Sequence, residues 1–135
     1  MALRLSPLLA LLLAVGLTAC GTSSSSTNNS EAVSSDRIIV EALSDPVSGM
    51  SAYDVVSQYR PQWLQKRGAT SINNPVDVQV YLDGTGTPYG SVESLRSIQA
   101  NQIATIEYFN ATRAQFRFGL SNTAGALLIK TKTGS

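Results

Sequence analysis

Two changes in composition confine any packed domain to the last part of this 135-residue chain. Residues 1–19 are almost entirely apolar, residues 21–36 are rich in Ser, Thr and Asn, and residues 37–135 mix apolar and polar types as globular domains do. About 100 residues make one domain, with a core only just large enough to fold alone. The single cysteine cannot form a disulfide within the chain, so we expect packing to supply the stability.

The apolar N-terminus has the features of an export signal. A positive charge on Arg4 precedes Leu8–Val15, an unbroken apolar run that is too short to span a bilayer. The run ends in Leu17-Thr18-Ala19-Cys20, which resembles the lipobox of bacterial lipoproteins. The resemblance implies cleavage before Cys20, diacylglycerol on its thiol, and a further acyl chain such as palmitate on the new N-terminus. We therefore predict a lipoprotein signal peptide over residues 1–19 and lipidation of Cys20.

The polar stretch after the cysteine predicts a flexible tether over residues 20–36. It contains too little apolar surface to offset the entropy of ordering it. A coil of this length lets the following domain lie roughly 20 Å from the lipid. Gly21 follows the cysteine, where an Asp retains enteric lipoproteins in the inner membrane, so the outer membrane, on its periplasmic side, is the expected location.

The charge balance and the missing histidines exclude several functions. Of ten basic residues only Arg4 precedes Cys20, so cleavage leaves nine basic and nine acidic residues, a net charge of zero. A neutral chain without a basic cluster predicts no nucleic-acid partner, because that affinity comes largely from phosphate neutralisation. The chain has no His, which excludes Ser-His and Cys-His nucleophilic sites and imidazole metal sites. We predict no enzyme activity, no metal site and no cofactor.

Periodicity within residues 37–135 predicts a small α+β domain with about four strands and two or three short helices. The expected strands follow β-branched or alternating runs and are Ile38–Val40, Val76–Leu82, Ile103–Phe109 and the central Ala126–Thr131. The first expected helix is capped at Ser51 and should kink or end at Arg60, before Pro61, with a further turn over Gln62–Lys66. The others are Val92–Ile98 and Ala111–Phe118, which Gly119 should end as a C-cap.

Three stretches in this pattern resemble the plug domain of TonB-dependent outer-membrane receptors. They are the turn Tyr81-Leu-Asp-Gly84, the paired motifs Leu95-x-x-Ile98 and Ile103-x-x-Ile106-Glu107-Tyr108, and Ala114-x-x-Arg117-Phe118-Gly119 followed by Gly125-Ala-Leu-Leu-Ile-Lys-Thr131. Their order and spacing match the family over about residues 50–132. The resemblance implies a plug-like fold that works by contact with an outer-membrane barrel or a periplasmic protein. Since no barrel sequence follows in this chain, we expect a plug-like module without the transport function of the receptors.

The candidate partner-binding residues are Tyr81, Asp83, Gly84 and Tyr89. Strand alternation places Tyr81 on a polar face, and Tyr89 belongs to the glycine-rich loop Gly84–Gly90, so both rings are expected to be exposed. The competing interpretation is a strand and its turn, in which Asp83 bonds local backbone. Most other aromatic residues are expected in the core.

Glu107 stands in an apolar strand, where an unpaired carboxylate would be costly. Its expected partner is Arg67, Arg113 or Arg117, and a glycosidase-like pair with Asp83 is disfavoured. Two functions stay open at this point. The first is a protein-interaction module anchored at the outer membrane. The alternative is a solute-binding lipoprotein that assists uptake, which a pocket with converging polar groups would favour.

Overall fold

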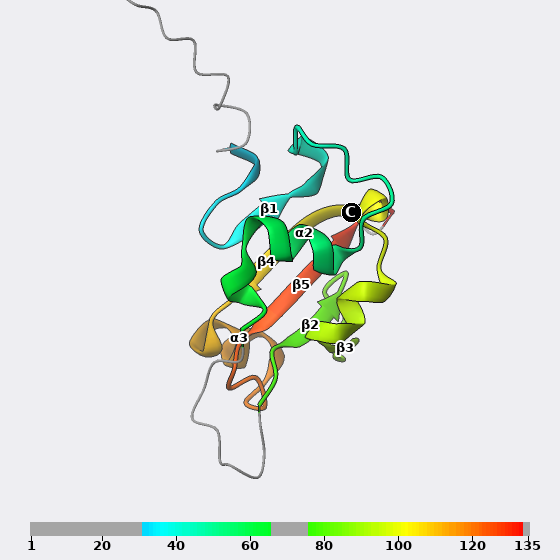
Figure 1. Cartoon of the computed structure of the whole chain (residues 1–135). Coiled ribbons are helices and arrows are strands. Elements are labelled where there is room, and N and C mark those ends of the chain that lie inside the picture. Colours follow the sequence, from blue (N-terminus) through cyan, green and yellow to red (C-terminus); the bar gives the residue numbers. More distant parts are fainter. Residues whose placement is uncertain (1–30, 66–75, 134–135) are drawn as a thin grey trace, which may run out of the picture.

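The computed structural model describes residues 31–65 and 76–133, which form an α+β domain around one five-stranded sheet (Figure 1). The strands are β1 (Arg37–Ile39), β2 (Gln79–Leu82), β3 (Gly90–Ser91), β4 (Ile103–Phe109) and β5 (Ala126–Thr131). They lie in the order β1-β4-β5-β2-β3, with β2 and β5 parallel and the other pairs antiparallel. The expected class is confirmed, and β3 is the additional strand. The predicted signal peptide, Cys20 and Arg67 lie outside the described residues.

Strand β5 forms the centre of the sheet, as its apolar run predicts. Ala126–Ile129 are fully buried. Ile129 is paired with Ile106 of β4 on one side, and Leu128 with Tyr81 of β2 on the other. A strand with neighbours on both edges and cover on both faces has no polar position in its middle, which explains the unbroken apolar sequence.

Helix α2 (Ala52–Tyr59) begins at a capping box. The Ser51 hydroxyl accepts from the backbone N–H of Asp54 at 3.3 Å, and the Asp54 carboxylate accepts from the Ser51 N–H at 2.9 Å. The helix ends at Tyr59 with Arg60 as its C-cap, so of the two outcomes expected before Pro61 the chain adopts an end and not a kink. In place of a turn over Gln62–Lys66, a 3₁₀ helix spans Pro61–Trp63 and buries the indole against Tyr108, with the ring centroids 5.5 Å apart.

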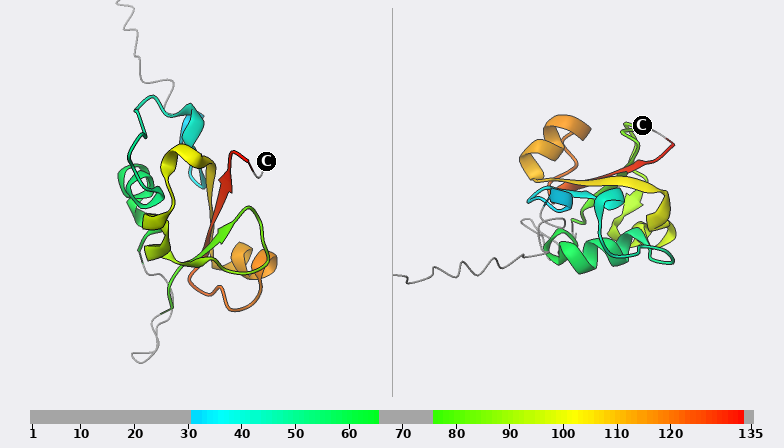
Figure 2. Two further views of the ribbon diagram at one scale, coloured as in Figure 1. Left: turned by 90° about the vertical axis from the view of Figure 1, so that its right-hand side faces the viewer. Right: turned by 90° about the horizontal axis from the view of Figure 1, so that it is seen from above.

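Two layers of different extent cover the two faces of the sheet (Figure 2). On one face lie α2 and the 3₁₀ helices Val40–Ala42, Pro61–Trp63, Val92–Ser97 and Ala100–Gln102. They enclose the main core, whose centre includes Val80 and Ile106, both fully buried as predicted. On the other face α3 (Ala111–Phe118) covers one end of the sheet over a smaller cluster that contains Tyr81, Phe109, Ala114, Ala126 and Leu128. The predicted helix over Val92–Ile98 is thus a 3₁₀ helix.

The packed domain begins earlier than its expected start at residue 37. Ala32 is fully buried, and Val33 forms an isolated bridge with Ile38 of β1. The guanidinium of Arg60 fastens this segment, since its Nη2 donates to the carbonyl of Ser34 at 2.8 Å. The boundary placed between tether and domain at residues 36 and 37 is therefore too late.

Glu107 is paired, and its described partners are residues other than Arg113 and Arg117. Its Oε1 lies 3.1 Å from Nη2 of Arg37 and 3.3 Å from Nζ of Lys130. The antiparallel register sets Arg37 directly opposite Glu107, whereas Arg113 on α3 pairs with Asp36 at 3.0 Å. Arg113 and Arg117 are therefore not its partners, because the strand register places Arg37 and Lys130 beside Glu107. The third predicted partner, Arg67, lies outside the described residues.

Candidate functional site

Tyr81 is not an exposed contact residue. Its side chain is 2% exposed, its ring stacks on Phe118 with centroids 4.0 Å apart, and its hydroxyl donates to Asn122 Oδ1 at 3.1 Å. Strand alternation does place Tyr81 on the face opposite Val80, as predicted. That face is not open at this point, because α3 covers it, so the prediction of exposure is corrected.

Tyr89 is half exposed, as predicted, and lies on the other side of the sheet. Its hydroxyl is 3.3 Å from Oγ of Ser97, which belongs to the layer that contains α2. Its backbone N–H donates to the carbonyl of Val80 at 2.7 Å. Tyr81 and Tyr89 therefore do not form one contact surface.

Asp83 and Gly84 form a tight turn that is hydrogen-bonded to the end of the neighbouring strand β5. Both have positive φ, of +50° and +74°. The Asp83 carboxylate accepts from the backbone N–H of Thr131 at 2.7 Å and from its hydroxyl at 3.0 Å. The partner is thus the end of the neighbouring strand and not local backbone. The turn holds the ends of β2 and β5 together, which favours the structural interpretation of this motif.

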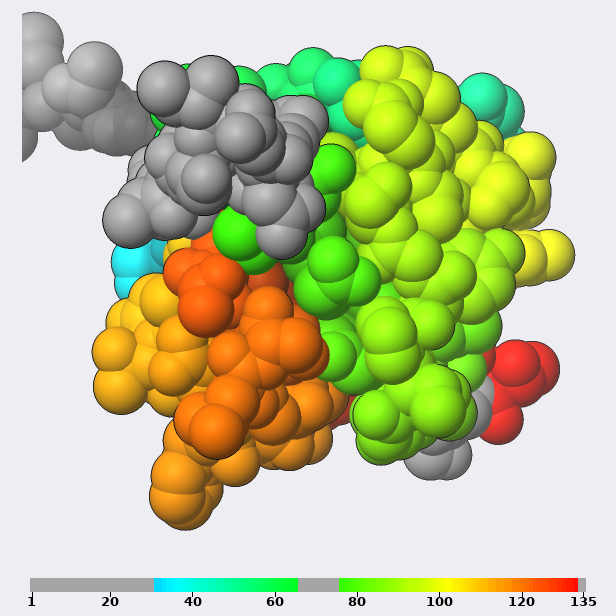
Figure 3. Space-filling view, turned by 90° about the horizontal axis from the view of Figure 1, so that it is seen from below, coloured from blue at the N-terminus to red at the C-terminus, as the bar shows by residue number. Residues whose placement is uncertain are grey.

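An open groove lies beside the glycine-rich loop and forms the best candidate site. We call it the β2 groove; its volume is about 410 Å³ and it is lined by Val76, Asp77, Gln79, Pro88, Gly90, Ser91, Ser121 and Thr123. Its floor is the chain entering β2, and its two walls are the loop that leads into β3 and the segment between α3 and β5 (Figure 3). Of the predicted residues, none lines the groove, although Pro88 and Gly90 flank Tyr89.

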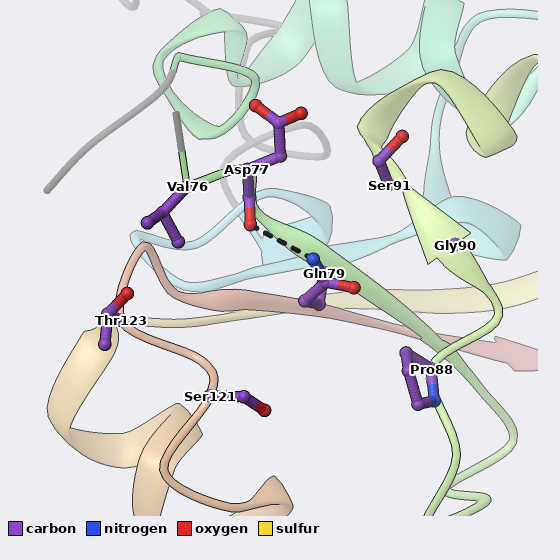
Figure 4. A pocket seen from close by; sticks show the side chains of 8 residues that line it. All are labelled: Val76, Asp77, Gln79, Pro88, Gly90, Ser91, Ser121 and Thr123. Carbon is purple, nitrogen blue, oxygen red and sulfur yellow. Dashed lines mark hydrogen bonds between the residues drawn. The ribbon is translucent and has the colours of Figure 1, made fainter. Parts of the chain in front are cut away.

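Neutral hydrogen-bonding groups dominate the groove (Figure 4). Hydroxyls come from Ser91, Ser121 and Thr123, on both walls. The Gln79 amide extends from the floor, and its Nε2 donates weakly to the carbonyl of Asp77 at 3.4 Å. Such groups can bind amide or hydroxyl partners, but they supply neither a nucleophile with its base nor a proton donor near neutral pH.

The strand edge along the groove is only partly paired. β3 is paired with Gln79 and Val80 alone, and 76–78 just ahead of β2 belong to no helix or strand. A second hollow, near Tyr53 and Val78, has a volume of about 100 Å³, well below the roughly 300–1,000 Å³ of ligand pockets.

The outer surface of α3 was not predicted. Phe116 is 95% exposed and Leu120, just beyond the helix, is 82% exposed, although most aromatic residues were expected in the core. The signal was present in the sequence: Ala114 and Phe118 are four residues apart and face the sheet, so Phe116 falls on the opposite side of the helix. A shallow hollow of about 480 Å³ lies beside it, between Phe109, Thr112, Arg113, Phe116 and Arg117.

Two carboxylates have pKa values shifted by well-defined contacts. The Arg113 guanidinium lowers the pKa of Asp36, and the backbone N–H of Ser51 lowers that of Asp54. Both shifts belong to structural contacts at the surface. No group of three metal-ligating side chains occurs among residues 31–65 and 76–133, and no helix there is long and apolar enough to cross a bilayer.

In comparisons with known proteins, no family model, no curated protein and no solved structure matches this chain. The sites on the chain itself are therefore the basis for a function.

Proposed function

We propose that this chain is an exported lipoprotein, lipidated on Cys20, whose domain binds another protein of the cell envelope. One observation carries the binding role: the β2 groove, about 410 Å³ in volume, lies beside the start of β2 and has neutral hydrogen-bonding groups on its floor and both walls. An extended segment of a partner could lie along it, with its amide and hydroxyl groups bonded to the Gln79 amide and the wall hydroxyls. The residues in the groove that supply these contacts come from three segments, which suits a long ligand.

The location and the anchor rest on the N-terminal sequence. The apolar run, the lipobox-like Leu17-Thr18-Ala19-Cys20 and the polar stretch after it support a lipid anchor, and Gly21 supports the outer membrane. Two or more acyl chains hold a protein effectively permanently, whereas one holds it reversibly. The resemblance to receptor plug domains supports a barrel or another envelope protein as the partner. Binding without turnover agrees with the lack of His and with a cysteine consumed by lipid.

A solute-binding lipoprotein is the second candidate. Its support is the volume of the β2 groove, about 410 Å³, which falls within the range of ligand pockets. Against it stand the open side of the groove and polar groups that are spread along both walls instead of converging on one point. The first function is therefore the stronger proposal.

Site-specific cross-linking in intact cells tests the binding role. A photoreactive benzoylphenylalanine at Thr123, which is exposed on one wall, should give discrete protein adducts, and Gln79→Ala should weaken them. The same photoreactive residue at Ser57, exposed on α2, is the matched control and should give none. Absence of adducts at Thr123, together with stoichiometric binding of a small molecule by the purified chain, would replace this function with solute binding.

The anchor is tested separately. Cys20→Ser should abolish incorporation of radiolabelled palmitate and leave the signal peptide uncleaved. Normal palmitate labelling of this variant would refute lipidation at Cys20 without bearing on the groove.

A further inference from the structure

The outer surface of α3 combines exposed apolar side chains with positive charge. Phe116 and Leu120 are the two most exposed large apolar residues of the described chain; Phe116 lies on α3, and Leu120 follows Gly119 at the end of the helix. The helix also carries Arg113 and Arg117 and no acidic residue. Neither apolar side chain belongs to the core, so both are available to an external partner.

The arginines of this surface lie against its aromatic rings. The guanidinium of Arg113 lies 5.0 Å from the centroid of the Phe109 ring, and that of Arg117 lies 5.4 Å from the same centroid. Arg113 also pairs with Asp36, whereas Arg117 has no acidic partner within 4 Å in the described chain. Both cations line the same hollow as Phe116, and Arg117 is available to an external anion.

The open part of the same sheet face adds more positive charge. Arg37 and Lys130 lie there about half exposed and share one carboxylate, that of Glu107. We use the term α3 face for the surface formed by Arg37, Lys130, Arg113, Phe116, Arg117 and Leu120. With their acidic partners Asp36 and Glu107 included, this face has four basic and two acidic residues, a net charge of +2.

The opposite layer of the domain has the opposite sign. The α2 layer carries Glu41, Asp45, Asp54 and Glu93 against Arg60 and Arg96, a net charge of −2. Figure 2 shows α3 and α2 on opposite faces of the sheet. Among these twelve charged residues, the positive surplus lies on the side of the sheet that carries Phe116, and the negative surplus lies on the other side.

We infer that the α3 face docks onto a bilayer surface that contains anionic lipids. Phe116 and Leu120 enter the boundary between headgroups and acyl chains, and Arg113 and Arg117 contact lipid phosphates. Interfacial protein surfaces combine Phe or Leu with Arg in this way, and the two acids of the α3 face, Asp36 and Glu107, are paired with its cations. Two protruding side chains without a surrounding apolar patch suit a deformable lipid surface better than a rigid protein partner. The acidic layer then faces away from the membrane, which avoids repulsion.

This docking is independent of what occupies the β2 groove, and a fluorescence experiment on the full chain tests it. The chain has one tryptophan, Trp63, which is 2% exposed and gives a constant background. Phe116→Trp places a reporter on the α3 face, and Tyr89→Trp places one on the other side of the sheet. Each protein is extracted from membranes and reconstituted into phosphatidylcholine vesicles with brominated acyl chains, with or without phosphatidylglycerol.

The Phe116→Trp emission should shift to the blue and be quenched in the phosphatidylglycerol vesicles, and the Tyr89→Trp emission should not. Adding Arg117→Gln should lower the ratio of docked to undocked domain about fivefold, the value of one charge at an anionic surface. Equal quenching of both reporters, or quenching of Phe116→Trp that is the same without phosphatidylglycerol, would overturn the inference. The inference would also be overturned if the Phe116→Trp protein sedimented with the vesicles but its emission was not quenched. In that case, cross-links from residue 116 to a protein would identify the true occupant. If both variant proteins stay in the supernatant when the vesicles are sedimented, docking is also overturned. That result would show in addition that the lipid anchor has failed.

Discussion

The hydroxyl of Tyr81 donates a 3.1 Å hydrogen bond to Oδ1 of Asn122, which lies 41 residues later in the chain. Asn122 is 1% exposed, and its Nδ2 donates in turn to the carbonyl of Gly119 at 2.9 Å. The bond joins β2 to the segment after α3 and seals the smaller cluster of the core. It also explains why a tyrosine, rather than a phenylalanine, stands at this buried position.

Tyr81→Phe should therefore destabilise the domain without affecting partner binding. The change leaves the Asn122 oxygen buried without its donor, which costs about 1–2 kcal/mol. Urea unfolding of the two proteins measures the difference. Tyr89→Phe is the matched control, because its hydroxyl is at the surface, and its cost should stay below about 0.5 kcal/mol. Equal effects of the two substitutions would show that the Tyr81–Asn122 bond adds no stability.

The turn at Asp83 predicts a difference between two small substitutions. Asp83→Ala removes the hydrogen bonds to Thr131 and places an alanine, which tolerates positive φ poorly, at a φ of +50°. Together these effects should lower the free energy of unfolding by about 1–3 kcal/mol. Asp83→Asn should cost less, because Asn tolerates this backbone conformation and keeps one side-chain acceptor. Chemical denaturation checks the order, and a loss as large for Asn as for Ala would contradict it.

Tyr59 predicts a late step in an alkaline titration. Burial raises the pKa of Tyr59 from 10.0 to about 12, and the hydrogen bond from its hydroxyl to Asp45 Oδ2, at 2.7 Å, adds to the shift. The folded state thus favours the neutral phenol. The resulting stability is complete below pH 10 and is lost as the pH rises from there through 12.

Ultraviolet absorbance of ionised tyrosine measures that step, and Tyr59→Phe should remove it. Asp45→Asn should lower the pKa of Tyr59 only part of the way, because burial is the larger cause and remains. A late step that persists in Tyr59→Phe would assign the shift to another tyrosine.

Local pattern was enough to predict several elements with their bounds. β4, α3 and β5 span the residues expected from alternation, from a helix that ends at Gly119 and from an unbroken apolar run. The capping box at Ser51 likewise predicts the start of α2. In each case the signal lies within the element itself, so no knowledge of the packing is needed. The two-residue β3 is too short to have such a signal, and periodicity does not distinguish a 3₁₀ helix from a short α-helix.

The candidate site was harder to predict because separate segments build it. Gln79 and Thr123 meet in the β2 groove through the parallel pairing of β2 with β5, which no local pattern encodes. Tyr81 was placed on the correct face of its strand, but the covering of that face by α3 is a tertiary event. The exposure of Tyr89 and the turn at Asp83 could be predicted, since loop composition and Asp-Gly are local signals.

A position can require glycine because its φ is positive or because a Cβ would clash, and three glycines differ in these two respects. A Cβ on Gly125 would lie 2.7 Å from the carbonyl oxygen of Phe109, and the residue has a φ of +101°. Gly119 has a φ of +106° but open space around it, and Gly86 has neither constraint. An alanine would therefore meet both backbone strain and a clash at position 125, backbone strain alone at position 119, and neither at position 86.

Gly125→Ala should be the most damaging, with a loss of about 2–4 kcal/mol, because a backbone carbonyl within a paired strand cannot move aside cheaply. Gly119→Ala should cost about 1–2 kcal/mol from strain at the end of α3, and Gly86→Ala should stay within about 0.5 kcal/mol. Urea unfolding of the three variants gives the order. If Gly125→Ala and Gly119→Ala cost the same, the contact with Phe109 is relieved by movement, and the backbone conformation alone requires glycine at the entry to β5.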